Sequence, residues 1–444
     1  MKILRLKYAL YICFLSIVYN CENNDDGDNT SDRGVQFVKT LGGDANDSAQ
    51  SVIATQDGGY ALLGFTQSSN GDITDKQDTS FDYWLLKFTS DDNLEWQKTY
   101  GGSNDDRGRA LIQTQDGGYA IIGTSNSNDA DVSGNNGAQD YWIAKLDPQG
   151  NVSWQKSLGF QGNDIGTSLI QTNDLGYLLT GVLDVTASGG AGNTNRSNTR
   201  HAGGDYWAIK LDALGALEWS RYFGGNFTDT PESAAETSEG AFIIVGGSDS
   251  EDTDISNNKG NYDFWVIKIS ATGDLIWEKS FGGDQIDEAR SIVKTNDGHF
   301  LIAGDTRSND QDVSSNKGAA DLWLIKITSD GNLIWEKTIG GSSFDVARAV
   351  KSTRDNGFIL SGSSRSSDGD VSINKGQNDA WVIKVNTEGE LEWETTAGGS
   401  NVDFAYSVAE LNDNSIIAVG DTTSQDSDIE NNQGFTDLLI IKIK

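Results

Sequence analysis

The chain has 444 residues, of which 36% are hydrophobic and 9% aromatic, and it contains 52 glycines but only 2 prolines. This composition is typical of a globular all-β protein and excludes an intrinsically disordered one. The formal net charge of −33 argues against nucleic acid and anionic membrane surfaces as partners, whereas cations and neutral polymers such as glycans remain open.

The N-terminal segment is expected to be a leader followed by a tether. Basic residues precede an apolar run over residues 8–19, which is too short to span a bilayer and is typical of a signal peptide. Cys21 and the acidic residues 22–26 come next and resemble a bacterial lipobox with a surface-export signal. We expect a signal peptide over residues 1–20, a lipid on Cys21, a tether over residues 21–34, and a location on the outer membrane facing the cell exterior. Plain secretion is the alternative.

Residues 35–444 consist of one repeated unit. A glycine followed by glycine or phenylalanine recurs at positions 42, 101, 159, 224, 282, 340 and 398, so successive units are 58 to 65 residues apart. Each unit contains four short segments rich in β-branched and aromatic residues, separated by turn residues, and this pattern predicts four strands. Seven units of four strands predict a seven-bladed β-propeller, with a solenoid as the rival architecture.

The last two segments of each unit form a hairpin that carries tryptophan. In the second unit this hairpin covers residues 140–159, where Asp-Pro-Gln-Gly supplies the turn. All 12 tryptophans occupy two slots of the hairpin, and we expect them in the core. The first slot holds Trp84, Trp142, Trp207, Trp265, Trp323 and Trp381, and the second holds Trp96, Trp154, Trp219, Trp277, Trp335 and Trp393.

The two ends of the chain decide between propeller and solenoid. The last unit stops after its third segment, residues 438–443, and residues 35–41 match the missing fourth segment, with Phe37 in the tryptophan slot. A propeller must close into a ring, and closure removes the exposed edge of the sheet. We therefore predict an all-β fold, a seven-bladed β-propeller with four-stranded blades, in which the N-terminal strand completes the last blade.

Two aspartates recur in every unit, and both sets are predicted to be structural, because aspartate readily accepts hydrogen bonds from nearby backbone amides. The alternative is that the first set forms a ring around the axis and holds a cation there. The first set precedes each inner strand and comprises Asp47, Asp106, Asp164, Asp229, Asp287, Asp345 and Asp403. The second set stands two residues before the first tryptophan slot and comprises Asp82, Asp140, Asp205, Asp263, Asp321, Asp379 and Asp437.

A third acidic pattern lies in the loop before the second aspartate. Oxygen-bearing side chains alternate along this loop, and the spacing resembles a calcium-binding loop, because a hard cation needs six to eight oxygen ligands. Side chains that order a polar loop by themselves explain the same pattern. The candidate calcium ligands are Asp129, Asp131, Ser133, Asn135 and Asp140 in the second unit, Asp252, Asp254 and Asp263 in the fourth, Asp310, Asp312 and Asp321 in the fifth, and Asp368, Asp370 and Asp379 in the sixth.

The third unit breaks the repeat with a longer loop over residues 184–204. This loop carries Arg196, Arg200 and His201 in an otherwise acidic rim, so it is a candidate binding site, with a tolerated surface insertion as the alternative. Aromatic residues such as Tyr262 and Phe344 are candidate platforms for sugar rings. The chain has only 2 histidines, too few for a histidine-rich metal site, and they make a Ser-His-Asp triad improbable.

The repeated motifs W-x-K, G-G, T-x-D-G-G-Y, D-x-D-V-S and D-Y-W-x-x-K resemble a family of repeat propellers on secreted and lipoprotein chains of Gram-negative bacteria. The resemblance covers residues 35–444 and implies the propeller fold. We expect a monomeric, non-catalytic binding or scaffold propeller, held at the membrane only by a lipid, with a glycan or protein ligand at the cell surface. A glycan-processing enzyme that uses rim carboxylates is the alternative.

Overall fold

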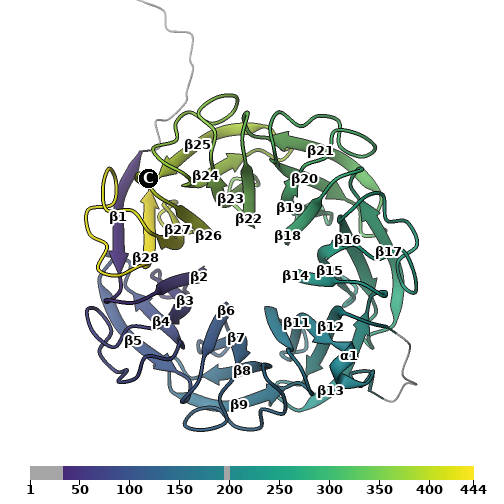
Figure 1. The fold of residues 1–444 in the computed structure, drawn as a ribbon, viewed down its shortest axis with the longest axis horizontal. Coiled ribbons are helices and arrows are strands. Elements are labelled where there is room, and N and C mark those ends of the chain that lie inside the picture. The colour runs from purple at the N-terminus through teal and green to yellow at the C-terminus, as the bar shows by residue number, and fades with distance from the viewer. Residues whose placement is uncertain (1–33, 195–200) are drawn as a thin grey trace, which may run out of the picture. The chain divides into compact units, whose positions relative to one another are not determined.

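The computed structural model describes residues 34–194 and 201–444. The expected leader, Cys21 and its tether, and also Arg196 and Arg200, lie outside the described residues. The described residues form seven antiparallel four-stranded sheets arranged in a ring (Figure 1). This arrangement confirms the predicted seven-bladed β-propeller. In this part of the chain, no helix has the length and apolar character needed to cross a membrane.

Each blade runs from an inner strand at the axis to an outer strand at the circumference (Figure 1). Blade 1 contains β2 (Asp47–Ala54), β3 (Tyr60–Thr66), β4 (Asp82–Phe88) and β5 (Leu94–Tyr100). Blade 2 contains β6 (Asp106–Gln113), β7 (Tyr119–Ser125), β8 (Asp140–Leu146) and β9 (Val152–Leu158). Blade 3 contains β10 (Ile165–Gln171), β11 (Tyr177–Asp184), β12 (Gly204–Leu211) and β13 (Leu217–Phe223), and the short helix α1 (Val185–Ser188) follows β11.

The remaining blades repeat the same order. Blade 4 contains β14 (Asp229–Glu236), β15 (Phe242–Ser248), β16 (Asp263–Ile269) and β17 (Leu275–Phe281). Blade 5 contains β18 (Asp287–Lys294), β19 (Phe300–Thr306), β20 (Asp321–Ile327) and β21 (Leu333–Ile339). Blade 6 contains β22 (Asp345–Ser352), β23 (Phe358–Ser364), β24 (Asp379–Val385) and β25 (Leu391–Ala397). Blade 7 contains β26 (Asp403–Glu410), β27 (Ile416–Thr422), β28 (Asp437–Ile443) and β1 (Val35–Leu41).

The N-terminal strand closes the ring as predicted. Strand β1 pairs with β28, and Phe37 lies opposite Lys442. In blade 1 the corresponding outer-strand residue, Trp96, lies opposite Lys87, so Phe37 occupies the tryptophan position. Phe37 also packs against the hydrophobic core between blades 7 and 1. Strands from the two ends of the chain therefore share one sheet.

The core consists of side chains packed between neighbouring blades. The third strand of each blade is buried along its length, because both of its faces are covered by adjacent sheets. The first-slot tryptophans pack in these layers. One of them packs edge to face against an aromatic ring of the preceding blade. Tyr83 lies 4.7 Å from Trp142 between ring centroids, and its hydroxyl donates to the Trp142 carbonyl at 3.0 Å. Blade packing is thus both apolar and hydrogen-bonded.

A β-bulge near the start of every inner strand sets the geometry of the axial channel. The register between the first two strands of each blade slips by one residue at the same place, for example between Ala49 and Ser51 in blade 1. The bulge brings the inner backbone against a glycine of the second strand: a Cβ on Gly64 would lie 1.8 Å from the Ser48 carbonyl oxygen. The bulged residues are Gln50, Arg109, Thr167, Glu232, Arg290, Arg348 and Tyr406.

Candidate functional site: the mouth of the axial channel

All seven bulged residues line one cavity of about 730 Å³ at the axis. Phe65, Arg107 and Asp421 also contribute to its wall. We call this cavity the channel mouth. A bulge turns one side chain per blade toward the axis without disturbing the alternation of the rest of the strand. The inner strands therefore hold seven side chains in a fixed ring, on the rigid part of the molecule rather than on the loops.

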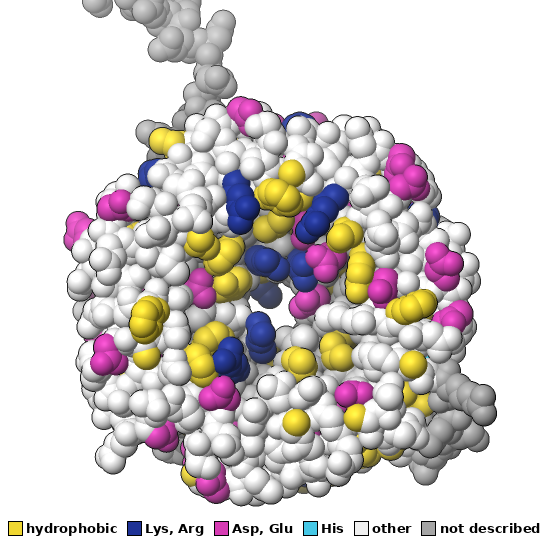
Figure 2. All heavy atoms as spheres, in the orientation of Figure 1, with side chains coloured by type: hydrophobic (Ala, Val, Ile, Leu, Met, Phe, Trp, Pro, Cys, Tyr) yellow, Lys and Arg dark blue, Asp and Glu magenta, His cyan; other side chains and the backbone are white. Residues whose placement is uncertain are grey.

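The channel mouth concentrates positive charge in an acidic protein. Figure 2 shows Lys and Arg side chains gathered around the central opening, with hydrophobic side chains and a few Asp and Glu side chains beside them, whereas the other Asp and Glu side chains are spread over the rest of the face. Three of the seven bulged residues are arginines, and Arg107 lies two residues before one of them. Because the formal net charge is −33, this local excess of guanidinium groups indicates a site for negative charge.

Arg290 is the arginine of this ring whose charge is balanced inside the protein. Its guanidinium forms ion pairs with Glu232 at 3.0 Å and Glu288 at 2.6 Å, and its Nε lies 3.7 Å from Asp305. Burial raises the pKa of Asp305. The side of the channel mouth formed by blades 4 and 5 is therefore a closed network of one arginine and three carboxyl groups.

The other two bulged arginines have few partners. Arg109 donates from Nη1 to the neutral amide oxygen of Gln50 at 3.1 Å. Arg348 Nε is buried and has no hydrogen-bond partner among the described residues. Both guanidinium groups act on the hydroxyl of Tyr406, whose pKa is raised by burial and lowered in part by the two arginines. Arg109 and Arg348 therefore flank Tyr406 with positive charge, and neither forms an ion pair within residues 34–194 and 201–444, although Arg348 lies close enough to Asp305 to lower the pKa of that carboxyl group.

A buried carboxyl group completes this side of the channel mouth. Asp421 accepts a hydrogen bond from Ser48 Oγ at 2.9 Å and one from the Tyr406 hydroxyl at 3.4 Å. Burial raises the pKa of Asp421 to about 6. A carboxyl group with this pKa exchanges a proton near neutral pH, so it can act as an acid or as a hydrogen-bond partner.

Aromatic rings with adjacent guanidinium groups lie near the channel mouth. Phe344 is 37% exposed, and the guanidinium carbons of Arg307 and Arg365 lie 5.8 and 5.5 Å from its ring centroid. A second group has Arg107 at 3.9 Å from the ring of Phe81. Such pairs offer a flat apolar face beside a fixed positive charge. Phe344, a residue singled out from the sequence, thus lies among arginines.

Of the other predicted binding residues, the structure places His201 at a blade junction and Tyr262 beside Thr228, which lines the channel mouth. The His201 side chain is 2% exposed, its Nδ1 bonds to Asp205 Oδ2, and its ring packs edge to face on Tyr222. Tyr262 is half-buried and pairs with Ile286 in a bridge between blades 4 and 5. His201 therefore belongs to a blade junction rather than to an open surface.

The first two predicted calcium ligands of blade 2 accept hydrogen bonds from backbone amides of the link between blades 1 and 2. Asp129 Oδ1 accepts from Ser103 N at 2.8 Å, and Asp131 Oδ2 accepts from Gly101 N at 3.3 Å. In the described residues, no group of three or more His, Cys, Asp and Glu side chains is placed to hold a metal ion. These contacts order the loop by hydrogen bonds, and calcium binding remains a prediction.

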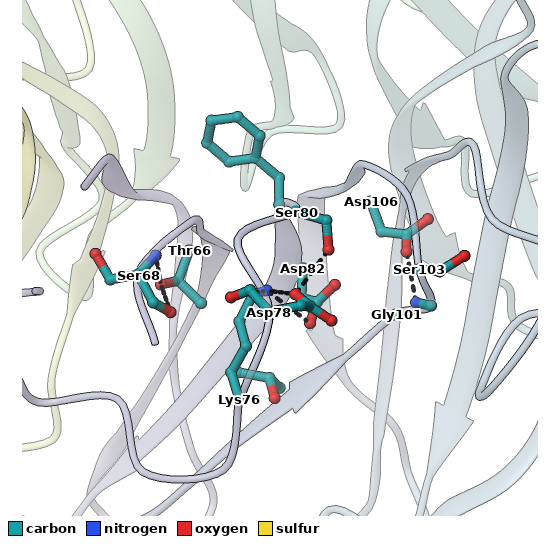
Figure 3. A network of polar contacts seen from close by, with 12 residues as sticks. Thr66, Ser68, Lys76, Asp78, Ser80, Asp82, Gly101, Ser103 and Asp106 are labelled. Carbon is teal, nitrogen blue, oxygen red and sulfur yellow. Dashed lines mark hydrogen bonds and ion pairs between the residues drawn. The ribbon is translucent and has the colours of Figure 1, made fainter. Parts of the chain in front are cut away.

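The two repeated aspartates meet at each blade junction. Figure 3 shows the junction of blades 1 and 2, where the ammonium group of Lys76 points toward Asp78 and lies 3.6 Å from Asp82 Oδ2. Asp106 accepts from Gly102 N at 2.8 Å and from Ser127 Oγ at 2.8 Å. These contacts confirm that the first aspartate set accepts hydrogen bonds from the backbone, and its side chains lie at the junctions rather than in the channel.

The second aspartate of each junction keeps one oxygen without a hydrogen-bond partner. This Oδ1 atom is buried in all seven junctions, and burial raises the pKa of the carboxyl group. For Asp82 and Asp263 the pKa is raised to about 7. The residues with this unpaired oxygen are Asp82, Asp140, Asp205, Asp263, Asp321, Asp379 and Asp437.

Sequence reasoning missed the ring of bulged residues. A signal for it exists in the sequence: the residue three positions after the first repeated aspartate is Gln, Arg, Thr, Glu, Arg, Arg and Tyr in the seven units, whereas the aspartate itself never changes. A position that varies between the units, close to one that never changes, indicates that the fold does not fix the residue type there. Such a position is free to serve a binding site. Its direction toward the axis depends on a bulge, which strand periodicity does not reveal.

Comparisons with known proteins do not assign a function. No protein-family model matches the chain, and no curated protein matches its sequence. Among solved structures, a protein of unknown function from Bacteroides caccae is 10% identical with a TM-score of 0.41, covering 76% of this chain and 93% of that chain. An aldose sugar dehydrogenase from Streptomyces coelicolor is 9% identical with a TM-score of 0.39, covering 93% and 98%. Similarities this low support no argument about activity.

Proposed function

We propose that the protein is a non-catalytic binding propeller, anchored at the cell surface, and that its channel mouth binds an acidic, carboxylate-bearing glycan. The observation that carries this proposal is Arg348, whose buried Nε has no hydrogen-bond partner among the described residues. A buried donor without a partner is costly, and a carboxylate that reaches it recovers that cost.

Other features support the same ligand class. Arg109 and Arg348 supply two positive charges to the cavity wall, and Phe344, four residues before Arg348, supplies a flat apolar face with two flanking arginines. Uronic acid residues combine a carboxylate with a sugar ring whose C–H face stacks on aromatic rings. The leader and Cys21 support anchoring, because a lipid on that residue would hold the propeller at the membrane.

The test is a titration of residues 34–444 with oligogalacturonate and with a neutral oligosaccharide of the same length. We expect binding of the acidic oligosaccharide that weakens with salt, because exposed charge pairs are screened. Arg348→Ala should reduce the affinity about 10- to 100-fold, the loss expected for one charge-assisted hydrogen bond. Lys337→Ala, on the exposed outer strand β21, is the matched control and should bind as the unchanged protein does. Equal binding of both oligosaccharides, or no effect of Arg348→Ala, would contradict the proposal.

One observation favours the enzymatic alternative. Asp421 lies in the wall of the channel mouth with its pKa raised to about 6, which suits a general acid in glycan cleavage. The two functions separate in one assay of reducing sugar released from the bound oligosaccharide. Turnover that disappears in Asp421→Asn while binding persists would replace the binding proposal with catalysis.

A further inference from the structure

A second cavity of about 520 Å³ lies at the other end of the inner strands. Its walls come from the last residues of β2, β22 and β26, which are neighbouring inner strands of blades 1, 6 and 7. It shares no lining residue with the channel mouth, which is formed at the beginnings of the same strands. We call it the far pocket.

One lysine interrupts the apolar wall of the channel at this level. Six residues after the first repeated aspartate, the other six inner strands carry aliphatic side chains, whereas β22 carries Lys351. Ile53 and Ala54 line the far pocket beside it with side chains that are at least partly exposed, whereas Val52 and Val408 behind them are buried. The aliphatic residues at the equivalent position are Ile53, Ile112, Ile170, Ala235, Val293 and Ala409.

The ammonium group of Lys351 differs from those of the buried lysines in the blades. In the third strands, Lys87, Lys145 and Lys210 each form an ion pair with an aspartate of the nearby hairpin turn, at 2.8 to 2.9 Å. Within residues 34–194 and 201–444, the structure gives Lys351 no ion pair and no hydrogen bond. Its charge is therefore not balanced by the protein around it.

The one carboxylate in the pocket wall is already engaged. Glu410 Oε2 accepts a hydrogen bond from the backbone nitrogen of Arg354 at 2.8 Å. The Arg354 side chain donates to the Asn412 side chain at 2.7 Å, so it is held toward blade 7. The Lys351 residue is exposed to solvent inside the channel, and the protein that surrounds the channel lowers its pKa. A ligand carboxylate at this position would restore the interaction with the charged form.

We propose that the far pocket is a second binding site, specific for a small amphipathic carboxylate whose acid group pairs with Lys351 and whose hydrocarbon part packs on Ile53 and Ala54. Charge complementarity selects the acid group, because a single unpaired ammonium faces the cavity. The aliphatic wall selects the hydrocarbon part, because burying it removes apolar surface from water. This site does not depend on the function proposed for the channel mouth.

The test is a titration of residues 34–444 with octanoate, and with octanamide as an uncharged probe of the same size. We expect octanoate to bind at least about 10-fold more tightly than octanamide, in line with one charge-assisted contact. Lys351→Met keeps the length and apolar character of the side chain and should remove this preference. Lys351→Arg keeps the charge and should retain part of it.

Arg348→Ala is the control for binding at the channel mouth, and it should leave octanoate affinity unchanged. Melting curves of both Lys351 variants report whether the fold is kept, and Lys351→Gln replaces Lys351→Met if that variant unfolds. The proposal is overturned if octanoate does not bind, if octanamide binds equally well, or if Arg348→Ala rather than the Lys351 change removes binding. The Lys351→Met variant should still bind the acidic oligosaccharide, and this result would show that the two sites are separate.

Discussion

Two positions three residues apart on each inner strand have opposite properties. The first is aspartate in all seven units, is fully buried, and fixes a blade junction. The second is the bulged residue, which faces the channel and is Gln, Arg, Thr, Glu or Tyr depending on the blade. The bulge between them separates a position that the fold requires from one that the fold leaves free. A repeated scaffold can therefore carry an asymmetric site at its axis.

The largest effect should come from opening the ring, on which both positions depend. Removing residues 35–41 exposes the edge of β28 and takes Phe37 out of the core. We expect a loss of about 5 kcal/mol or more in the free energy of unfolding, from lost apolar burial and strand hydrogen bonds. The measurement compares melting curves of chains that begin at residue 34 and at residue 42. Equal melting temperatures would refute closure by β1.

The next largest effect should come from filling the space that the bulge uses. A Cβ on Gly246 would lie 1.9 Å from the Thr230 carbonyl oxygen, whereas the nearest atom to a Cβ on the adjacent Gly247 lies at 3.6 Å. Gly246→Ala should therefore cost about 3 kcal/mol by forcing the inner strand to move. Gly247→Ala is the matched control and should change stability by less than about 1 kcal/mol. Denaturant unfolding of the two variants measures the difference, and equal losses would show that the bulge does not need this glycine.

The junction carboxyl groups should make the protein more stable in mild acid. Burial raises the pKa of Asp82, Asp229 and Asp263 to about 7, above the usual value near 4. Between these values the folded protein binds more protons than the unfolded chain, so stability falls as pH rises from about 4 to 7. We expect a melting temperature several degrees higher at pH 5 than at pH 8 by scanning calorimetry.

Other carboxyl groups set the acid limit of this effect. Partial burial alone would raise the pKa of Asp116, but hydrogen bonds from Thr114 and Lys145 hold it at about 2. Such a group stabilises the fold above about pH 4 and loses this contribution as pH falls toward 2. Stability should therefore be highest near pH 4 to 5. Asp263→Asn removes one raised pKa and should flatten the slope between pH 5 and 8; an unchanged slope would exclude the junctions as its source.

The smallest effect concerns the loops next to the junctions. If calcium binds the alternating oxygens with a Kd near 0.1 mM, millimolar calcium would add about 1 kcal/mol per site, and magnesium less, because it requires a tighter geometry. Melting curves in EDTA, calcium and magnesium at matched ionic strength measure this. Equal effects of the two cations, unchanged in Asp131→Asn with Asp312→Asn, would show that hydrogen bonds such as the one from Gly101 N to Asp131 order the loops alone.

The amino-acid sequence by itself determined the architecture. The repeat length, the hairpin with its two tryptophan slots, and the split seventh unit predicted the blades and the strand that closes them, down to Phe37 in the tryptophan position. These features are visible in sequence because strand pattern, turn residues and repetition are local properties of the chain. Repetition also showed that the first aspartate set is structural, since every blade needs the same junction.

Only the tertiary structure decided where chemistry can occur. Arg109, Arg348 and Tyr406 lie in different units and look like single polar residues in a strand, yet seven bulges bring their positions together around one axis. His201 looked accessible in a long loop, but the fold buries it beside Asp205. Lys351 differs from its six aliphatic counterparts already in the sequence, but only the fold shows that it lines a cavity shared by three blades. Charge and burial at these residues depend on contacts between blades, which the order of residues along one strand does not specify.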